Sequence, residues 1–100
     1  RLPFLKGAME LAREGVVPGG TTRNLEHVRP WTTFAAALEP WQLLLAADAQ
    51  TSGGLVLAVP PEGLTRTVTA LEQSGAQAAA VIGRVEESGE TLVRLETAAG

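Results

Sequence analysis

The side chains best suited to chemistry lie in one polar loop, Asp48-Ala49-Gln50-Thr51-Ser52-Gly53-Gly54. Thr51 and Ser52 supply hydroxyls, Gln50 supplies an amide, and Gly53 and Gly54 leave backbone N–H groups open to close approach. Together these groups could hold a phosphate. The ordinary alternative is a turn in which the polar side chains satisfy the backbone between a helix and a strand. The loop differs from a P-loop, because no lysine follows the glycines and a strand rather than a helix comes next.

A second polar loop lies upstream, and we expect it to span Val16 to Asn24. Its Pro18-Gly19-Gly20 core cannot continue a helix, while Thr21, Thr22 or Asn24 could cap the next one. Arg23 could clamp an anion among these polar neighbours. The alternative is an arginine that is simply solvated in a loop.

Residues for catalysis and metal binding are scarce. His27 is the only histidine, and nothing near it in sequence orients its imidazole, so we expect no catalytic role. Ser52 lacks the Gly-x-Ser-x-Gly flanks of a hydrolase nucleophile. Asp48 has no second carboxylate nearby, which favours a structural role in a turn over a metal site. Because cysteine is also absent, we expect no catalytic and no metal-binding residue in this chain.

The elements that must position these loops follow from the apolar pattern. Apolar residues recurring every three or four positions predict helices at 3–14, 25–28, 39–48 and 60–74. We expect Gly7 inside the first helix, with Gly15 and Gly75 ending the first and last. Apolar runs or β-branched composition predict strands at 32–36, 55–59, 78–85 and 91–96. For 32–36 the alternative is a helix, which its alanines would suit equally.

These elements predict the α+β class, with a mixed β-sheet and helices packed on it. The strand at 55–59, the helix after it and the strand at 78–85 form a right-handed crossover unit. A hairpin at 86–90 then adds 91–96 as an antiparallel neighbour. Trp31 and Trp41 carry the largest apolar areas, so we expect them to anchor the core or an interface.

Size and charge narrow the classes of function. The 100 residues make one domain or part of one. The net charge is -3, and the sequence contains no run of basic residues that would attract nucleic acid or an anionic membrane. No apolar stretch reaches the length of a membrane span, and the first residues do not resemble a signal peptide. Zero cysteine fits a reducing cytosol. The first residue, Arg1, suggests a mature product or a piece of a longer protein.

Three motifs in order resemble the C-terminal part of the selenide, water dikinases, also called selenophosphate synthetases. They are Gly15-Val16-Val17-Pro18-Gly19-Gly20-Thr21-Thr22-Arg23-Asn24, Asp48-Ala49-Gln50-Thr51-Ser52-Gly53-Gly54-Leu55 and Ala79-Ala80-Val81-Ile82-Gly83-Arg84-Val85. Ala49 stands where proline is usual in that family, which loosens the loop but leaves its polar groups in place. The resemblance covers nearly the whole chain.

The resemblance implies a parent enzyme that uses ATP, selenide and water to make selenophosphate, AMP and phosphate, with magnesium neutralising the phosphates. The family is similar in fold to the aminoimidazole ribonucleotide synthetase group, in which an N-terminal half forms a dimer barrel and a C-terminal α+β half closes over the nucleotide. The family's reactive cysteine or selenocysteine, its lysine and its magnesium-binding aspartates all precede the region matched here. Residues 1–100 are then an incomplete C-terminal domain, and the N-terminal catalytic and ATP-binding half is absent from them.

On this resemblance we expect a cytoplasmic homodimeric parent with ATP, selenide and its own N-terminal half as partners, and a fragment that alone is inactive and binds neither ATP nor Mg²⁺. The fragment would contribute one wall of a phosphate pocket, formed by Gln50, Thr51, Ser52, Gly53, Gly54, Gly19, Gly20, Thr21 and Asn24. One alternative is a free-standing α+β module that binds a ligand or a protein through its tryptophans. Another is a related synthetase with a different substrate, because the fold does not choose the chemistry.

Overall fold

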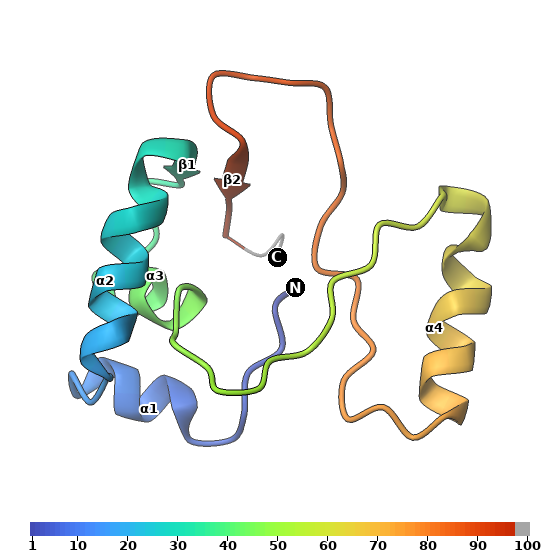
Figure 1. Ribbon diagram of the computed structural model, residues 1–100, viewed down its shortest axis with the longest axis horizontal. Coiled ribbons are helices and arrows are strands. Elements are labelled where there is room, and N and C mark those ends of the chain that lie inside the picture. Colours follow the sequence, from blue (N-terminus) through green and yellow to red (C-terminus); the bar gives the residue numbers. More distant parts are fainter. Residues whose placement is uncertain (98–100) are drawn as a thin grey trace. The chain divides into compact units, whose positions relative to one another are not determined.

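The computed structural model describes residues 1–97 and divides them into two compact units (Figure 1). The larger unit contains residues 4–51 and 86–97, and the smaller unit contains residues 1–3 and 52–85. The chain therefore leaves the larger unit once and returns to it. Helices combined with a small parallel sheet confirm the α+β class.

Three helices form most of the larger unit. They are α1 (Ala8–Arg13), α2 (Gly19–Val28) and α3 (Pro40–Ala46), and a 3-10 turn, η1 (Arg29–Trp31), extends α2. Both α1 and α2 pack against α3. Within residues 1–97, the buried side chains are Ala12 of α1 and Leu25 and Thr21 of α2, and of these Thr21 alone has no exposed surface.

A two-stranded sheet completes the larger unit. β1 (Thr32–Phe34) pairs in parallel with β2 (Val93–Leu95), with Thr32 opposite Val93 and Phe34 opposite Leu95. The expectation of a strand at 32–36 is thus confirmed over three residues. The antiparallel hairpin predicted between 78–85 and 91–96 is wrong, because the last strand pairs with β1 instead. This pairing joins distant segments, which no local sequence pattern encodes.

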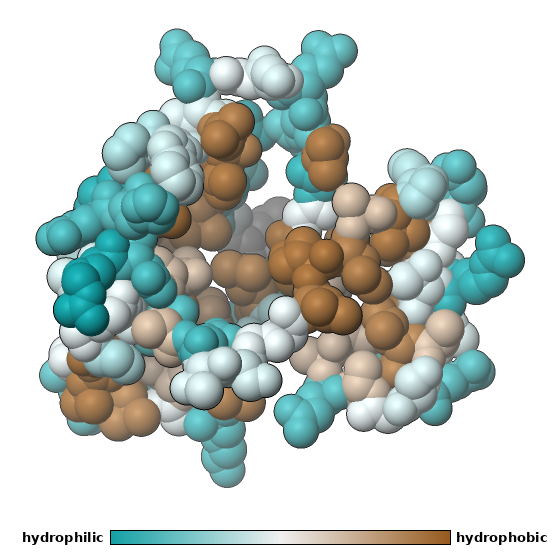
Figure 2. Space-filling view, viewed as in Figure 1, coloured by the Kyte–Doolittle hydropathy of each residue, from teal (hydrophilic) through white to brown (hydrophobic). Residues whose placement is uncertain are grey.

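The smaller unit contains a 3-10 turn, η2 (Pro61–Gly63), and the helix α4 (Leu64–Gln73). The segments 55–59 and 78–85 were predicted as strands and pair with no other strand among residues 1–97. Leu55 is 90% exposed and Val56 80% exposed, and in Figure 2 apolar side chains gather beside α4. An apolar run predicts that the side chains of a segment favour burial. A strand also needs a neighbouring strand for its backbone hydrogen bonds.

The ends of α1 and α4 follow the glycine rules, with one correction. Gly15 (φ 79°) and Gly75 (φ 81°) adopt the left-handed conformation just past these helices, as predicted. Gly7 (φ 87°) does the same before α1, so it lies outside the helix and not inside it. The predicted helix at 3–14 is accordingly shortened to Ala8–Arg13, because a left-handed residue cannot continue a right-handed helix.

The starts of α2 and α3 test the expectations about capping. The predicted loop from Val16 to Asn24 is wrong beyond Pro18, since α2 begins at Gly19 with Pro18 at its N-cap and no side-chain cap. Glycine disfavours a helix only weakly, so the burial of one face of α2 can outweigh it. The predicted start of α3 at Glu39-Pro40 is confirmed, with a capping box between Glu39 and Gln42.

Over residues 1–97, every helix falls short of the length and apolar character that crossing a membrane requires.

Candidate functional site

The first turn of α2 and the segment leading into the polar loop are joined by one threonine hydroxyl. Thr21 is 0% exposed; its Oγ1 donates to Asp48 Oδ1 at 2.6 Å and accepts the N–H of Ala49 at 3.1 Å. The hydroxyl therefore uses both its donor and its acceptor capacity inside the protein. This geometry gives Asp48 the structural role that the sequence favoured.

Two further residues of α2 hold the same segment. Asn24, which lies one helical turn after Gly20, donates from Nδ2 to the carbonyl oxygen of Ala47 at 3.1 Å. A Cβ added at Gly20 would lie 3.2 Å from Ala49 Cβ, which is tighter than most contacts between such atoms. Gly20, Thr21 and Asn24 share one face of α2, as their three- and four-residue spacing requires. That face carries the Ala47–Ala49 segment.

The start of α2 offers groups that attract an anion. The N–H groups of Gly19 and Gly20 precede the first hydrogen bond of the helix and no side chain caps them, whereas the Thr21 N–H donates to the Pro18 carbonyl at 3.0 Å. The Arg23 guanidinium lies over this turn, with Nη1 3.5 Å from a Cβ built at Gly19 and Nη2 3.8 Å from one built at Gly20. Uncapped N–H groups, the positive end of the helix dipole and a guanidinium favour phosphate or carboxylate.

The polar loop itself is open to solvent. Gln50, Thr51, Ser52, Gly53 and Gly54 are all exposed, and the side chains of the first three make no hydrogen bond within residues 1–97. The loop leaves the larger unit at Thr51 and enters the smaller unit at Ser52. Its hydroxyls and amide therefore remain available for a ligand, which the phosphate hypothesis needs.

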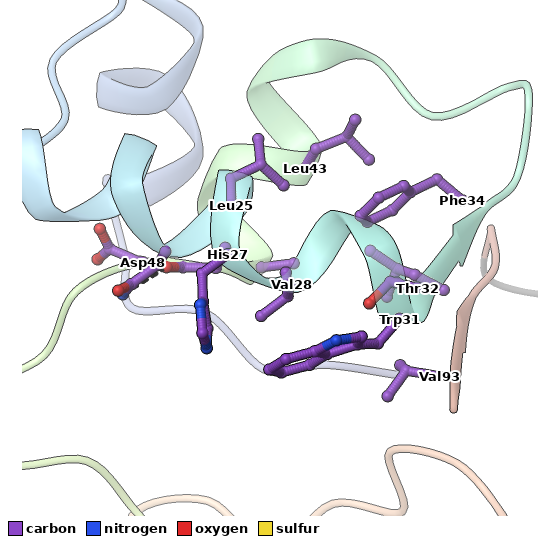
Figure 3. A pocket seen from close by; sticks show the side chains of 13 residues that line it. Leu25, His27, Val28, Trp31, Thr32, Phe34, Leu43, Asp48 and Val93 are labelled. Atoms are coloured by element: carbon purple, nitrogen blue, oxygen red, sulfur yellow. Dashed lines mark hydrogen bonds between the residues drawn. The ribbon is translucent and has the colours of Figure 1, made fainter. Parts of the chain in front are cut away.

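A cavity that the sequence reasoning missed lies beside α2 in the larger unit, with a volume of about 380 Å³ (Figure 3). Val28, Trp31, Phe34 and Val93 supply apolar lining, and Asp48 is among its polar members. The apolar face of α2 hinted at a buried surface there. The return of β2 from the end of the chain, which closes one side, had no such local indication.

The aromatic side chains are engaged within the larger unit. The His27 ring meets the Trp31 ring edge-on at a centroid distance of 4.7 Å, and both line the cavity. The Arg13 guanidinium lies 4.5 Å from the centre of the Trp41 ring and so links α1 to α3. Trp41 is half-buried in this contact and Trp31 is 44% exposed, so the prediction that the two tryptophans anchor the core is wrong for Trp31, and an interface role for either stays a prediction.

Across residues 1–97, the structure brings no three histidine or acidic side chains close enough together to hold a metal ion.

Comparison with protein families gives one match over most of the chain. The model of the AIR synthase related protein, C-terminal domain, matches residues 7–96. This range includes the first turn of α2 and the polar loop, so both parts of the candidate site lie inside the matched domain.

Curated relatives carry the name selenide, water dikinase. The protein of Myxococcus xanthus (strain DK1622) is 42% identical over 86 residues, which cover 86% of this chain and 24% of that protein. The protein of Carboxydothermus hydrogenoformans is 40% identical over 81 residues, 81% of this chain and 24% of its own length. That of Pelobacter propionicus is 38% identical over 94 residues, 94% of this chain and 26% of its own length.

The chain thus spans about a quarter of the length of the curated relatives it matches. No solved structure matches it.

Proposed function

We propose a function on the premise that this chain belongs to the AIR synthase related protein family and carries its C-terminal domain. Relatives named selenide, water dikinase match most of the chain, and this supports reading it as the C-terminal part of such an enzyme. The parent enzyme then uses ATP, selenide and water to make selenophosphate, AMP and phosphate. We further propose that the parent is a cytoplasmic homodimer and that this part alone is inactive.

Within that enzyme, this chain supplies one wall of the phosphate pocket. The first turn of α2 with Arg23 offers fixed positive groups, and Gln50, Thr51 and Ser52 offer donors from the loop. Phosphoryl transfer depends mainly on positioning and on neutralising the charge of the phosphates, and these groups suit that task. The observation that carries the proposal is that the donors of the loop are exposed and unused within residues 1–97.

Magnesium, which the family implies, does not fit the residues described here, since they contain no cluster of acidic or histidine ligands. We therefore assign no metal-binding step to this chain. The metal ligands and the reactive groups are proposed to lie in the N-terminal half of the parent. ATP fits better, because exposed hydroxyls, an uncapped helix start and a guanidinium are suited to its phosphates.

The test replaces the two hydroxyls in the full-length enzyme, as Thr51→Val combined with Ser52→Ala. A hydrogen bond to a charged group contributes about 1.5–3 kcal/mol, so we expect selenophosphate production to fall by about tenfold or more. The free energy of unfolding should change little, because both side chains are exposed. Selenophosphate formation and urea unfolding are measured on the same preparation.

A matched control removes the same two groups elsewhere on the surface, as Thr69→Val combined with Ser88→Ala. Both of these positions are exposed and lie outside the candidate site. The control should keep normal production. If the loop variant also keeps normal production, the loop does not contact the substrate.

A further inference from the structure

We propose that Thr21 and Asn24 are positioning residues: they hold the Ala47–Ala49 segment on α2 and so fix where the phosphate-facing loop begins. This inference rests on the proposed function, but it assigns these two side chains a different role from ligand contact. The uncapped first turn of α2 and the exposed loop would bind the phosphates. The face of α2 that carries Thr21 and Asn24 would set the distance between that turn and the start of the loop.

The first step of the argument is the burial of Thr21. With no exposed surface, its hydroxyl cannot reach a ligand in this conformation. The 2.6 Å separation between Oγ1 and Asp48 Oδ1 is the length expected for a hydroxyl bonded to a carboxylate, which is a strong class of hydrogen bond. The same oxygen accepts the N–H of Ala49. One side chain therefore orients both the carboxylate and the backbone that follows it.

The second step is that three consecutive residues are held by three residues of α2. Asn24 binds the carbonyl of Ala47, Thr21 binds Asp48 and Ala49, and the absence of a side chain at Gly20 lets Ala49 approach. A segment attached at successive residues can neither slide along the helix nor rotate away from it. Gln50 follows Ala49 in the chain, so the position at which the loop begins is set by the Ala47–Ala49 segment.

The third step concerns the two groups of phosphate donors. Arg23 and the first N–H groups belong to α2, while Gln50 and Thr51 belong to the loop. The contacts of Gly20, Thr21 and Asn24 with Ala47–Ala49, here called the clamp, join these two segments and so limit how far the start of the loop can move from the first turn of α2. Preorganised donors bind a phosphate without paying the entropy of ordering the loop.

The experiment compares Thr21→Val, which keeps the shape but removes the hydroxyl, with Thr21→Ser, which keeps the hydroxyl. Both are made in the full-length enzyme. In Thr21→Val we expect faster hydrogen exchange at the amides of residues 49–54. We also expect the KM for ATP to rise by about tenfold, with a much smaller change in kcat. Thr21→Ser should restore both values.

Thr67→Val is the matched control, because Thr67 Oγ1 donates to the carbonyl of Gly63 at 2.9 Å in a part-buried bond of α4. The same substitution here removes a neutral hydroxyl hydrogen bond that lies far from the loop in sequence, and it should leave the exchange of 49–54 and the KM unchanged. Should Thr21→Val fail to fold, Asn24→Ala tests the same clamp from an exposed position, with the same direction of change and a smaller size.

Two results would overturn the inference. Unchanged exchange at residues 49–54 in the folded Thr21 and Asn24 variants would show that the clamp does not hold the loop. Faster exchange with an unchanged KM would show that the clamp has no part in ATP binding. The exchange measurement needs no activity, so it separates the failure of the clamp from the failure of the loop proposal, which the Thr51 and Ser52 variant tests.

Discussion

At the residue scale, the two glycines that begin α2 have different surroundings. A Cβ at Gly19 would meet only the end of the flexible Arg23 side chain at 3.5 Å, whereas a Cβ at Gly20 would lie 3.2 Å from Ala49 Cβ. Neither glycine has a positive φ, so the backbone itself accepts alanine at both positions. The difference between them is therefore a difference in packing against the segment that precedes the loop.

We predict different effects for alanine at these two positions. Gly19→Ala should raise the free energy of unfolding by up to about 1 kcal/mol, because alanine favours a helix over glycine. Gly20→Ala should lose that gain, because the new methyl group pushes against Ala49. Urea unfolding of the two variants measures the difference. Equal stabilisation by both would mean that the segment is not packed closely on Gly20.

The sequence grouped residues that the structure connects to the segment before the polar loop, but it did not predict how they are connected. It selected Gly20, Thr21 and Asn24 as one group, yet it interpreted them as a loop and as helix caps. The bond from Thr21 to Asp48 crosses 27 residues, and nothing in the local pattern of either segment indicates the other. Local polarity can predict that a threonine needs a partner, but only the tertiary fold chooses it.

At the element scale, α3 shows how much a helix start depends on local chemistry. The backbone N–H of Glu39 donates to Gln42 Oε1 at 2.8 Å, and Trp41 Nε1 donates to Glu39 Oε2 at 2.8 Å. The Glu39 side chain also accepts the N–H of Gln42, which completes the capping box. All these groups lie within four residues, which is why the start of α3 was predictable.

We predict that Glu39→Ala lowers the free energy of unfolding by about 1 kcal/mol, the usual cost of losing an N-cap. The indole N–H of Trp41 also loses its acceptor, so its fluorescence should change. Glu26→Ala is the control, since Glu26 is exposed within α2 and alanine suits a helix. Thermal unfolding followed by circular dichroism compares the two. Equal midpoints would contradict the role of Glu39 as a cap.

The strands were less predictable than the helices, for a physical reason. A helix satisfies its backbone within its own segment, so caps and glycines fix its ends locally. A strand depends on a partner elsewhere, and β1 finds its partner in β2 near the end of the chain. The apolar composition of 55–59 and 78–85 predicts buried strands, but in residues 1–97 these segments form no strand and most of their apolar side chains are exposed, because composition alone does not supply a neighbouring strand.

At the scale of the whole molecule, apolar side chains are exposed in the smaller unit. Leu55, Val56 and Leu57 come directly after the polar loop, and Val81 and Ile82 belong to the second exposed run. Contiguous apolar surface of this kind favours association with another surface. The proposed N-terminal half of the parent would provide one.

We predict that the 100-residue chain alone self-associates through these runs. Leu55→Ser combined with Leu57→Ser should weaken association by about tenfold or more, because each exposed leucine that becomes buried contributes about 1.5–3 kcal/mol. Sedimentation across a range of concentrations measures the effect. Leu5→Ser, a change at an exposed leucine of the larger unit, is the control. A chain that stays monomeric, or equal association in both variants, would contradict the prediction.

The parallel pairing of β1 with β2 also dictates an order of assembly during protein synthesis. The ribosome releases β1 before residues 52–85, so its partner strand β2 emerges only after that part of the smaller unit has been made. Until then the nascent larger unit has three helices and one unpaired strand edge, the kind of surface that chaperones cover. Residues 52–85 of the smaller unit are therefore inserted between two segments of the larger unit, and their synthesis delays the pairing of β1 with β2.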